Sequence, residues 1–166
     1  MSPTNAWAVR LVAPGPADRI LEIGCGSGLA TARIADALTT GRVTAIDRSA
    51  TAVARASSRN ADAIAAGRAH VVQATLAEFT AAEGFAKVLA VNVNLFWTGP
   101  SAGELASLSR LLAPSGTAWL CYDTPSRGAA ERAAANLFAA GFTTETFAGP
   151  TPSSFCITVS HVPPTS

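Results

Sequence analysis

The sequence has little lysine, little cysteine and no long apolar run. It contains 11 arginines but one lysine, Lys87, and its formal net charge is +1 over 166 residues. Because no basic stripe is present, the electrostatic footprint of a nucleic-acid-binding or membrane-binding surface is missing. The apolar runs are of strand length, so we expect neither a transmembrane helix nor a signal peptide. We therefore expect a cytoplasmic protein with no nucleic-acid or membrane partner.

The three cysteines are Cys25, Cys121 and Cys156, far apart in the sequence and without a Cys-x-x-Cys pair or a Cys/His cluster. This pattern predicts neither a disulfide framework nor a zinc site, and no metal is expected. We interpret the cysteines as small apolar residues. One domain of this length buries ~70% of the surface of its unfolded chain, which is enough to fold without cross-links.

The most informative segment is residues 20–28, Ile-Leu-Glu-Ile-Gly-Cys-Gly-Ser-Gly, in which an apolar strand runs into three glycines. Gly24, Gly26 and Gly28 let the main chain approach a ligand closely. Residues 29–38 are rich in helix formers, so a helix begins just after the glycines. Its free N–H groups and the positive end of its dipole would point at a ligand in the turn, which predicts a nucleotide-binding turn.

The spacing of the glycines separates two cofactor classes. A dinucleotide fingerprint, G-x-G-x-x-G, needs a small residue where this chain has Leu29. A nicotinamide-dependent oxidoreductase is therefore disfavoured, although it stays an alternative. Tight NADH binding would revive it.

A second strand is predicted at residues 42–46, and it ends at Asp47, 19 residues beyond Gly28. A carboxylate at this point can accept hydrogen bonds from both ribose hydroxyls of a nucleoside. Asp47 and Ser49 also precede an alanine-rich helical stretch, so either residue could be a helix cap. The two roles of Asp47 do not exclude each other.

The remaining pattern alternates strands and helices and ends in two strands without a helix between them. Strands are predicted at 20–23, 42–46, 70–73, 88–91, 117–122, 143–147 and 155–160, and helices at 5–11, 29–38, 50–66, 103–112 and 127–140. This order predicts an α/β fold with a doubly wound, mostly parallel sheet and a C-terminal antiparallel hairpin. We expect one domain, with a short N-terminal helix or cap (1–18), a core (19–160) and a frayed tail (161–166).

This order and three motifs resemble class I S-adenosylmethionine-dependent methyltransferases with seven-stranded sheets, most closely the small-molecule enzymes of ubiquinone and menaquinone biosynthesis. Residues 19–28 are similar to the glycine motif of the family, and residues 43–49, Val-Thr-Ala-Ile-Asp-Arg-Ser, to its ribose motif. Residues 110–117 are similar to its R-x-L-x-P-G-G turn, with Ser115 in place of the first glycine.

The resemblance implies that S-adenosylmethionine is the cofactor and that residues at the ends of the first four strands hold it. The implied cofactor-binding residues are Glu22, Gly24, Cys25, Gly26, Gly28, Asp47, Arg48, Thr75, Leu76 and Asn92. Asp47 would hold the ribose hydroxyls and Arg48 would lie along the adenine. The family usually has an aspartate where Thr75 stands, so about 1 kcal/mol of adenine binding is expected to be lost. The Thr75 hydroxyl and the Leu76 amide remain available to the adenine edge.

Residues 91–97, Val-Asn-Val-Asn-Leu-Phe-Trp, resemble the segment of the family that contacts the methionine ammonium group and walls the substrate pocket. Asn92 and Asn94 would point the same way if the chain stays extended. The N/D-P-P-Y/F motif of enzymes that methylate amide or ring nitrogens is absent, so those acceptors are less expected. The predicted substrate pocket comprises Trp7, Asn94, Trp97 and Tyr122.

No catalytic base is assigned. Phe96 and Trp97 fit a core or interface role as well as a substrate role. Tyr122 and Asp123 end the fifth strand at the ligand-binding edge, but we interpret them as scaffold. His70 starts a strand at the opposite edge and His161 lies in the tail, so we interpret both histidines as surface residues.

Only 18 residues precede Arg19, fewer than family members usually have to cover the substrate, so we expect an open site. A helix over residues 5–11 would place Trp7 over the cofactor, and a homodimer or another partner could cover the rest. The preferred function is methyl transfer to oxygen or carbon of a small metabolite. The alternative is a cofactor-binding protein that does not methylate, either a cyclase-like enzyme or a regulatory partner.

Overall fold

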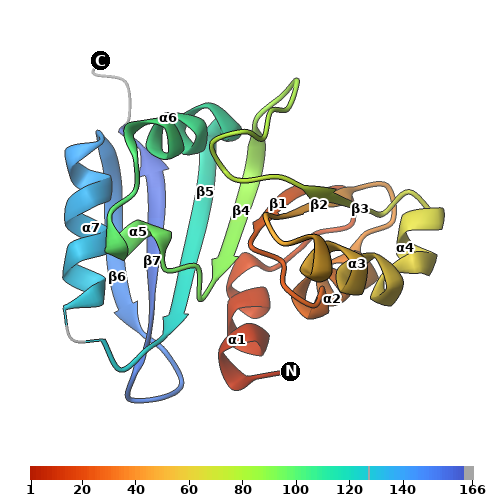
Figure 1. The fold of residues 1–166 in the computed structure, drawn as a ribbon, viewed down its shortest axis with the longest axis horizontal. Helices are drawn as coiled ribbons and strands as arrows, with labels where there is room; N and C mark the ends of the chain where they lie inside the picture. The colour runs from red at the N-terminus through yellow and green to blue at the C-terminus, as the bar shows by residue number, and fades with distance from the viewer. Residues whose placement is uncertain (127, 163–166) are drawn as a thin grey trace.

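Seven strands form one sheet in the computed structural model, which describes residues 1–126 and 128–162 (Figure 1). The strands are β1 (Arg19–Ile23), β2 (Arg42–Asp47), β3 (Ala69–Gln73), β4 (Phe85–Val91), β5 (Leu112–Asp123), β6 (Phe142–Ala148) and β7 (Ser154–His161). Their order across the sheet is β3-β2-β1-β4-β5-β7-β6. The neighbours among β1 to β5 pair in parallel, whereas β7 is antiparallel to both β5 and β6. The predicted fold class is confirmed, and β7 is the reversed strand.

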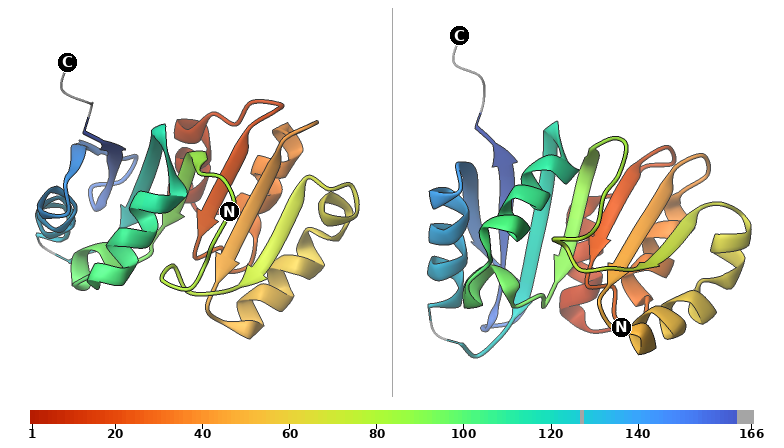
Figure 2. Two further views of the ribbon diagram at one scale, coloured as in Figure 1. Left: turned by 90° about the horizontal axis from the view of Figure 1, so that it is seen from above. Right: turned by 45° about the horizontal axis from the view of Figure 1, so that its top comes forward.

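Helices cover both faces of the sheet (Figure 2). They are α1 (Pro3–Val12), α2 (Leu29–Ala37), α3 (Ala50–Arg59), α4 (Ala61–Ala65), α5 (Leu95–Thr98), α6 (Ala102–Leu111) and α7 (Ala129–Ala139). Buried side chains of α5, α6 and α7 share one core cluster with the sheet, and those of α1, α2 and α4 share a second. Val88 and Ala90 belong to the first cluster and Leu89 to the second, because successive side chains of a strand point to opposite faces. Among the described residues, no helix combines the length and the apolar character needed to span a bilayer.

The single helix predicted over residues 50–66 is wrong, because Asn60 divides it into α3 and α4. Asn60 has φ −105° and ψ 19°, outside the helical region. Its side-chain Nδ2 donates to the carbonyl oxygens of Ala56 (2.8 Å) and Gly28 (3.1 Å). The second bond joins the helix to a residue 32 positions earlier, and periodicity cannot reveal such a contact.

The fifth strand begins at Leu112 rather than at the predicted residue 117, because a bulge accommodates Pro114. The register with β4 pairs Leu112 with Phe85 and Thr117 with Lys87, so four residues of β5 (113–116) lie opposite the single residue Ala86 of β4. A bulge is one of the few places in a sheet that tolerate proline. The short helix α5 was not predicted.

At the C-terminal end, β7 continues through His161, so this residue belongs to the sheet and not to a tail. Its ring nitrogen Nε2 lies 3.0 Å from the Leu112 carbonyl oxygen, at the start of β5. The predicted helix start at Arg127 and residues 163–166 of the predicted tail lie outside the described residues.

Candidate functional site

The glycine turn after β1 is held by the end of β2. The N–H groups of Gly24 and Cys25 donate to the Ile46 carbonyl oxygen (2.8 and 3.0 Å), and the Gly26 N–H donates to Asp47 Oδ2 (3.0 Å). Gly24 has φ +71°, and a Cβ there would lie 2.6 Å from Val93 Cγ2. Glycine at this position is therefore required both by the backbone conformation and by the close approach of the loop after β4.

Two consecutive residues at the end of α3 hold the far side of the turn. Arg59 Nε donates to the Ser27 carbonyl oxygen (2.9 Å), and Asn60 Nδ2 donates to that of Gly28 (3.1 Å). Gly28 is the N-cap of α2, so these bonds also fix where that helix begins. Sequence reasoning missed this pair, since only the tertiary fold brings α3 against the turn.

Asp47 connects the glycine turn with α3, and its carboxylate also lines a cavity. Its Oδ1 accepts a hydrogen bond from the Ser49 N–H (2.9 Å), while Ser49 Oγ accepts from the Ala52 N–H (3.3 Å) and caps α3. The capping alternative therefore applies to Ser49. Each carboxylate oxygen of Asp47 carries one hydrogen bond and retains capacity for a ligand hydroxyl.

Glu22 is buried directly behind the turn, with 4% of its surface exposed. Burial raises the pKa of Glu22 to about 7, and the charge of Asp47 adds to this effect, although a hydrogen bond from Thr31 Oγ1 opposes it. Burial also raises the pKa of Cys25 to about 12, so this cysteine is a thiol at neutral pH and not a nucleophile.

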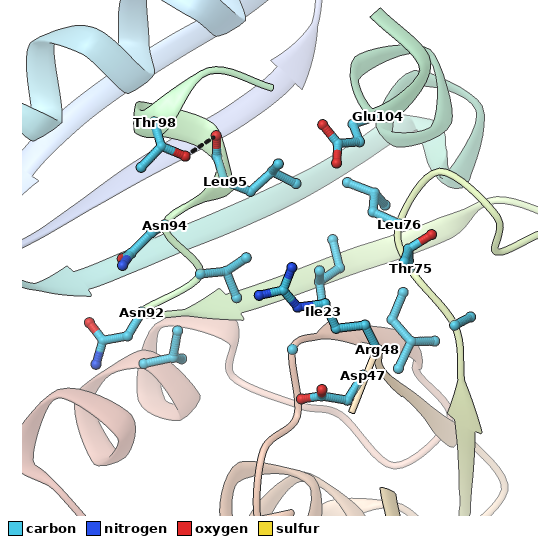
Figure 3. Close-up of a pocket in the computed structure, with 15 residues that line it drawn as sticks. Ile23, Asp47, Arg48, Thr75, Leu76, Asn92, Asn94, Leu95, Thr98 and Glu104 are labelled. Carbon is cyan, nitrogen blue, oxygen red and sulfur yellow. Dashed lines mark hydrogen bonds between the residues drawn. The ribbon is translucent and has the colours of Figure 1, made fainter. Parts of the chain in front are cut away.

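Two cavities meet at the carboxyl ends of β1 and β4. The larger, about 510 Å³, is shown in Figure 3 and is lined by Ile23, Gly24, Ile46, Asp47, Arg48, Ala74, Thr75, Leu76, Val91, Asn92, Val93, Asn94, Leu95, Thr98 and Glu104. The smaller, about 170 Å³, is lined by Asn5, Glu22, Gly24, Cys25, Gly26, Ser27, Leu29, Ala30, Val91 and Asn92. Gly24, Val91 and Asn92 border both. Nine of the ten predicted cofactor residues line one or both cavities, and the tenth, Gly28, is buried behind the turn.

Asn92 joins the ends of β4 and β5 at the border of the two cavities. Its N–H donates to the Cys121 carbonyl oxygen (2.9 Å), and its Oδ1 accepts from the Asp123 N–H (2.8 Å). With φ +56°, Asn92 is not extended, and Asn94 already has helical angles at the start of α5. The extended chain assumed in the prediction for Asn92 and Asn94 is therefore wrong, although both residues line the larger cavity.

Thr75 lines the larger cavity, but its hydroxyl group is hydrogen-bonded to Glu78. Thr75 Oγ1 donates to Glu78 Oε2 (2.7 Å) and accepts from the Glu78 N–H (3.3 Å). The hydrogen bond from the Thr75 hydroxyl lowers the pKa of the Glu78 carboxyl, and the Thr75 N–H, which donates to the same oxygen (3.2 Å), adds to this effect. By contrast, the Leu76 N–H has no hydrogen-bond acceptor among the residues that the structure describes.

Three of the four residues predicted for a substrate pocket line neither cavity. Trp7 packs edge-on against Phe147 (5.9 Å between ring centroids), because α1 presents this side chain to the β6–β7 hairpin. Asn5, two residues earlier, lines the smaller cavity instead. Tyr122 is fully buried and donates its hydroxyl to the Val93 carbonyl oxygen (2.8 Å). Trp7 therefore contacts the hairpin and lines neither cavity, and its place over the cofactor stays a prediction.

Trp97, the third of these residues, packs against the core and under the Arg132 guanidinium group, 5.4 Å from its ring centroid. Phe96 is fully buried. Asp123 accepts hydrogen bonds from Thr4 Oγ1 (3.2 Å) and Ser153 Oγ, and the bond from Ser153 lowers its pKa. These contacts are structural and tie α1 and the hairpin to the end of β5.

Outside the glycine motif, three polar residues that line the cavities were not predicted, namely Asn5, Thr98 and Glu104. Of these, only Glu104 had a signal in the sequence. Ser101 and Glu104 form a capping box at the start of α6, in which Ser101 Oγ accepts from the Glu104 N–H (3.2 Å) and Glu104 Oε2 from the Ser101 N–H (2.6 Å). The S-x-x-E spacing is the usual mark of this motif.

A glycine turn, an acidic residue and a cavity at the carboxyl edge of an open α/β sheet define a nucleoside-binding protein of the Rossmann-like class. Residues 20–116 match the family model described as a methyltransferase domain, which is more than half of the chain. The chain belongs to this methyltransferase family. It is a class I S-adenosylmethionine-dependent methyltransferase by family and fold, with S-adenosylmethionine as cofactor.

Solved structures with this fold include proteins of different chemistry. An O-methyltransferase from Thermotoga maritima has a TM-score of 0.76 and 14% identity, over 98% of this chain and 66% of that one. The N-methyltransferase NodS from Bradyrhizobium japonicum, in complex with S-adenosylhomocysteine, has a TM-score of 0.72 and 20% identity, over 95% of this chain and 85% of that one. The [4+2]-cyclase SpnF has a TM-score of 0.75 and 16% identity, over 93% of this chain and 80% of that one. No curated protein sequence matches this chain.

Proposed function

We propose that this chain transfers the methyl group of S-adenosylmethionine to an oxygen or carbon atom of a small metabolite. This proposal rests on the pair of cavities that meet at Gly24 and Asn92, with the Asp47 carboxylate on the wall of the larger one. The larger cavity suits the adenosine part of the cofactor and the smaller one its methionine part. The chain has Asn-Val-Asn-Leu at 92–95, not N/D-P-P-Y/F, which favours oxygen or carbon acceptors over amide and ring nitrogens.

In this proposal Asp47 accepts hydrogen bonds from the ribose hydroxyls and Arg48 lies along the adenine. The glycine turn and the main chain near Asn92 border the methionine. The sulfonium group of the cofactor supplies an activated methyl donor, so the protein has to orient the acceptor and keep it in line.

The acceptor side is open, because Asn92, Asn94 and Thr98 line the cavity and are nevertheless exposed. We infer that a second copy of the chain or another protein covers it during turnover. Light scattering of the purified chain with and without S-adenosylhomocysteine tests this inference, since a homodimer doubles the measured mass.

Methyl transfer is tested with S-adenosylmethionine labelled in the methyl group. The protein is incubated with a metabolite extract from its source organism, and label in small molecules is followed by chromatography and mass spectrometry. Label on an oxygen or carbon atom is the expected result. The control is Asp47→Ala, which is expected to bind the cofactor more weakly and to give less labelled product. Bound cofactor with no labelled product would contradict methyl transfer and favour the non-methylating alternative.

A further inference from the structure

Glu104 is the second carboxylate of the larger cavity, and the binding scheme above leaves it without a ligand. The other carboxylate is Asp47. Figure 3 shows the Glu104 side chain over the cavity at the end opposite Asp47, with Thr75 and Leu76 along the wall between them. A carboxylate on a cavity wall favours a hydrogen-bond donor as its ligand, because it can only accept.

One oxygen of Glu104 is available to such a donor. Oε2 accepts the N–H of Ser101 in the capping box. Oε1 has no hydrogen-bond partner in the part of the chain that the structure describes. The capping box fixes the direction of the side chain, because both of its hydrogen bonds join the same two residues across one helical turn. Glu104 therefore presents its second oxygen in a defined position.

The adenosine part of the cofactor carries donors at both of its ends. The ribose hydroxyls lie at one end, and the 6-amino group of the adenine lies at the other, next to N1, which is an acceptor. With the hydroxyls at Asp47, the base extends along the wall that Thr75 and Leu76 form. The free N–H of Leu76 suits N1. Thr75 is a weaker acceptor for the amino group than a carboxylate, and its hydroxyl already donates one hydrogen bond to Glu78 and accepts one from it.

We propose that Glu104 Oε1 accepts a hydrogen bond from the 6-amino group of the cofactor's adenine and makes the site select adenine over its 6-oxo analogue. This inference rests on the proposed placement of the cofactor, with its ribose at Asp47. A 6-oxo group would face the carboxylate with an acceptor, and the adjacent ring N–H would face the Leu76 N–H. Both contacts would then be repulsive, which is a strong basis for discrimination.

The test compares S-adenosylhomocysteine with S-inosylhomocysteine by calorimetric titration. A hydrogen bond to a charged group predicts that the protein binds the adenine compound roughly ten- to hundredfold more tightly. In Glu104→Gln the carboxamide oxygen keeps the capping bond from the Ser101 N–H, so the group that faces the cavity is an NH₂ that can only donate. The preference should therefore fall to within about threefold, mainly through weaker S-adenosylhomocysteine binding.

The matched control is Ser101→Ala, which removes the other half of the capping box and leaves the carboxylate in place. This variant should lose stability in thermal unfolding and keep most of the preference for adenine. Equal affinity of the wild-type protein for both compounds would overturn the proposal, and so would an unchanged preference in Glu104→Gln. Tight binding of both compounds would leave methyl transfer itself intact, whereas no binding of S-adenosylhomocysteine would count against the cofactor site as a whole.

Discussion

Replacing Asn60 by alanine should destabilise the protein and weaken cofactor binding together, because Asn60 holds the glycine turn from α3. The side chain is 3% exposed and donates to the carbonyl oxygens of Gly28 and Ala56. Each of these carbonyls also accepts a backbone N–H, from Ala32 and from Asn60 itself, so neither is left unpaired. Two side-chain hydrogen bonds at ~1 kcal/mol each set the loss at about 2 kcal/mol.

Part of this loss should be offset, because Asn60 Oδ1 is buried without a hydrogen-bond partner among the described residues. Asn60→Asp gives a sharper test with almost the same shape, since an ionised carboxylate would face two carbonyl oxygens. Burial should raise the folded-state pKa of this aspartate above its unfolded value. The protonated form is then favoured by folding, so stability should fall as pH rises from the unfolded pKa to the folded one.

The assay is urea unfolding of both variants at several pH values, with calorimetric titration of S-adenosylhomocysteine under native conditions. Ser58→Ala, on an exposed position of the same helix, is the control and should change neither quantity. Asn60→Ala with full stability and full cofactor affinity would refute the role given to α3. A loss of stability in Asn60→Asp that does not change with pH would refute the expected rise in the pKa of this aspartate.

The remaining predictions concern four residues of the site and its surroundings. Glu22 has its pKa raised to about 7 by burial, so stability should fall by up to about 3 kcal/mol between pH 4.5 and 7, and Glu22→Gln should abolish this slope in urea unfolding. Asp47→Asn should weaken S-adenosylhomocysteine binding roughly tenfold or more in calorimetry, because a charged acceptor is lost; an unchanged affinity would contradict ribose binding. Gly24→Ala should lower both stability and affinity, since its φ is +71° and its Cβ would lie 2.6 Å from Val93 Cγ2. Trp7→Ala should lower the thermal midpoint but leave cofactor affinity unchanged, and a loss of affinity would restore Trp7 to the site.

The parts of this protein that sequence could predict are those set by local pattern. The strand before Gly24, the helix after Gly28 and the acidic end of β2 follow from apolar runs, glycine conformation and helix propensity over short distances. The same local signals placed Asp47 beside the turn, because parallel strands that neighbour each other end at one edge.

The missed features all depend on contacts between distant segments. Trp7 faces the hairpin because of how α1 docks on the sheet, and Asn60 breaks a helix because Gly28 lies beside it. Cys121 and Cys156 are 35 positions apart, and the pairing of β5 with β7 places their free thiols 3.2 Å apart. Periodicity contains no information about these encounters.

The most direct test of the account is a parallel calorimetric titration of the purified chain with S-adenosylmethionine, S-adenosylhomocysteine and NADH. We expect micromolar binding of the first two and none of NADH, with the affinity for S-adenosylhomocysteine reduced in Asp47→Asn. Tight binding of NADH, or no binding of either sulfur compound by the folded protein, would contradict it.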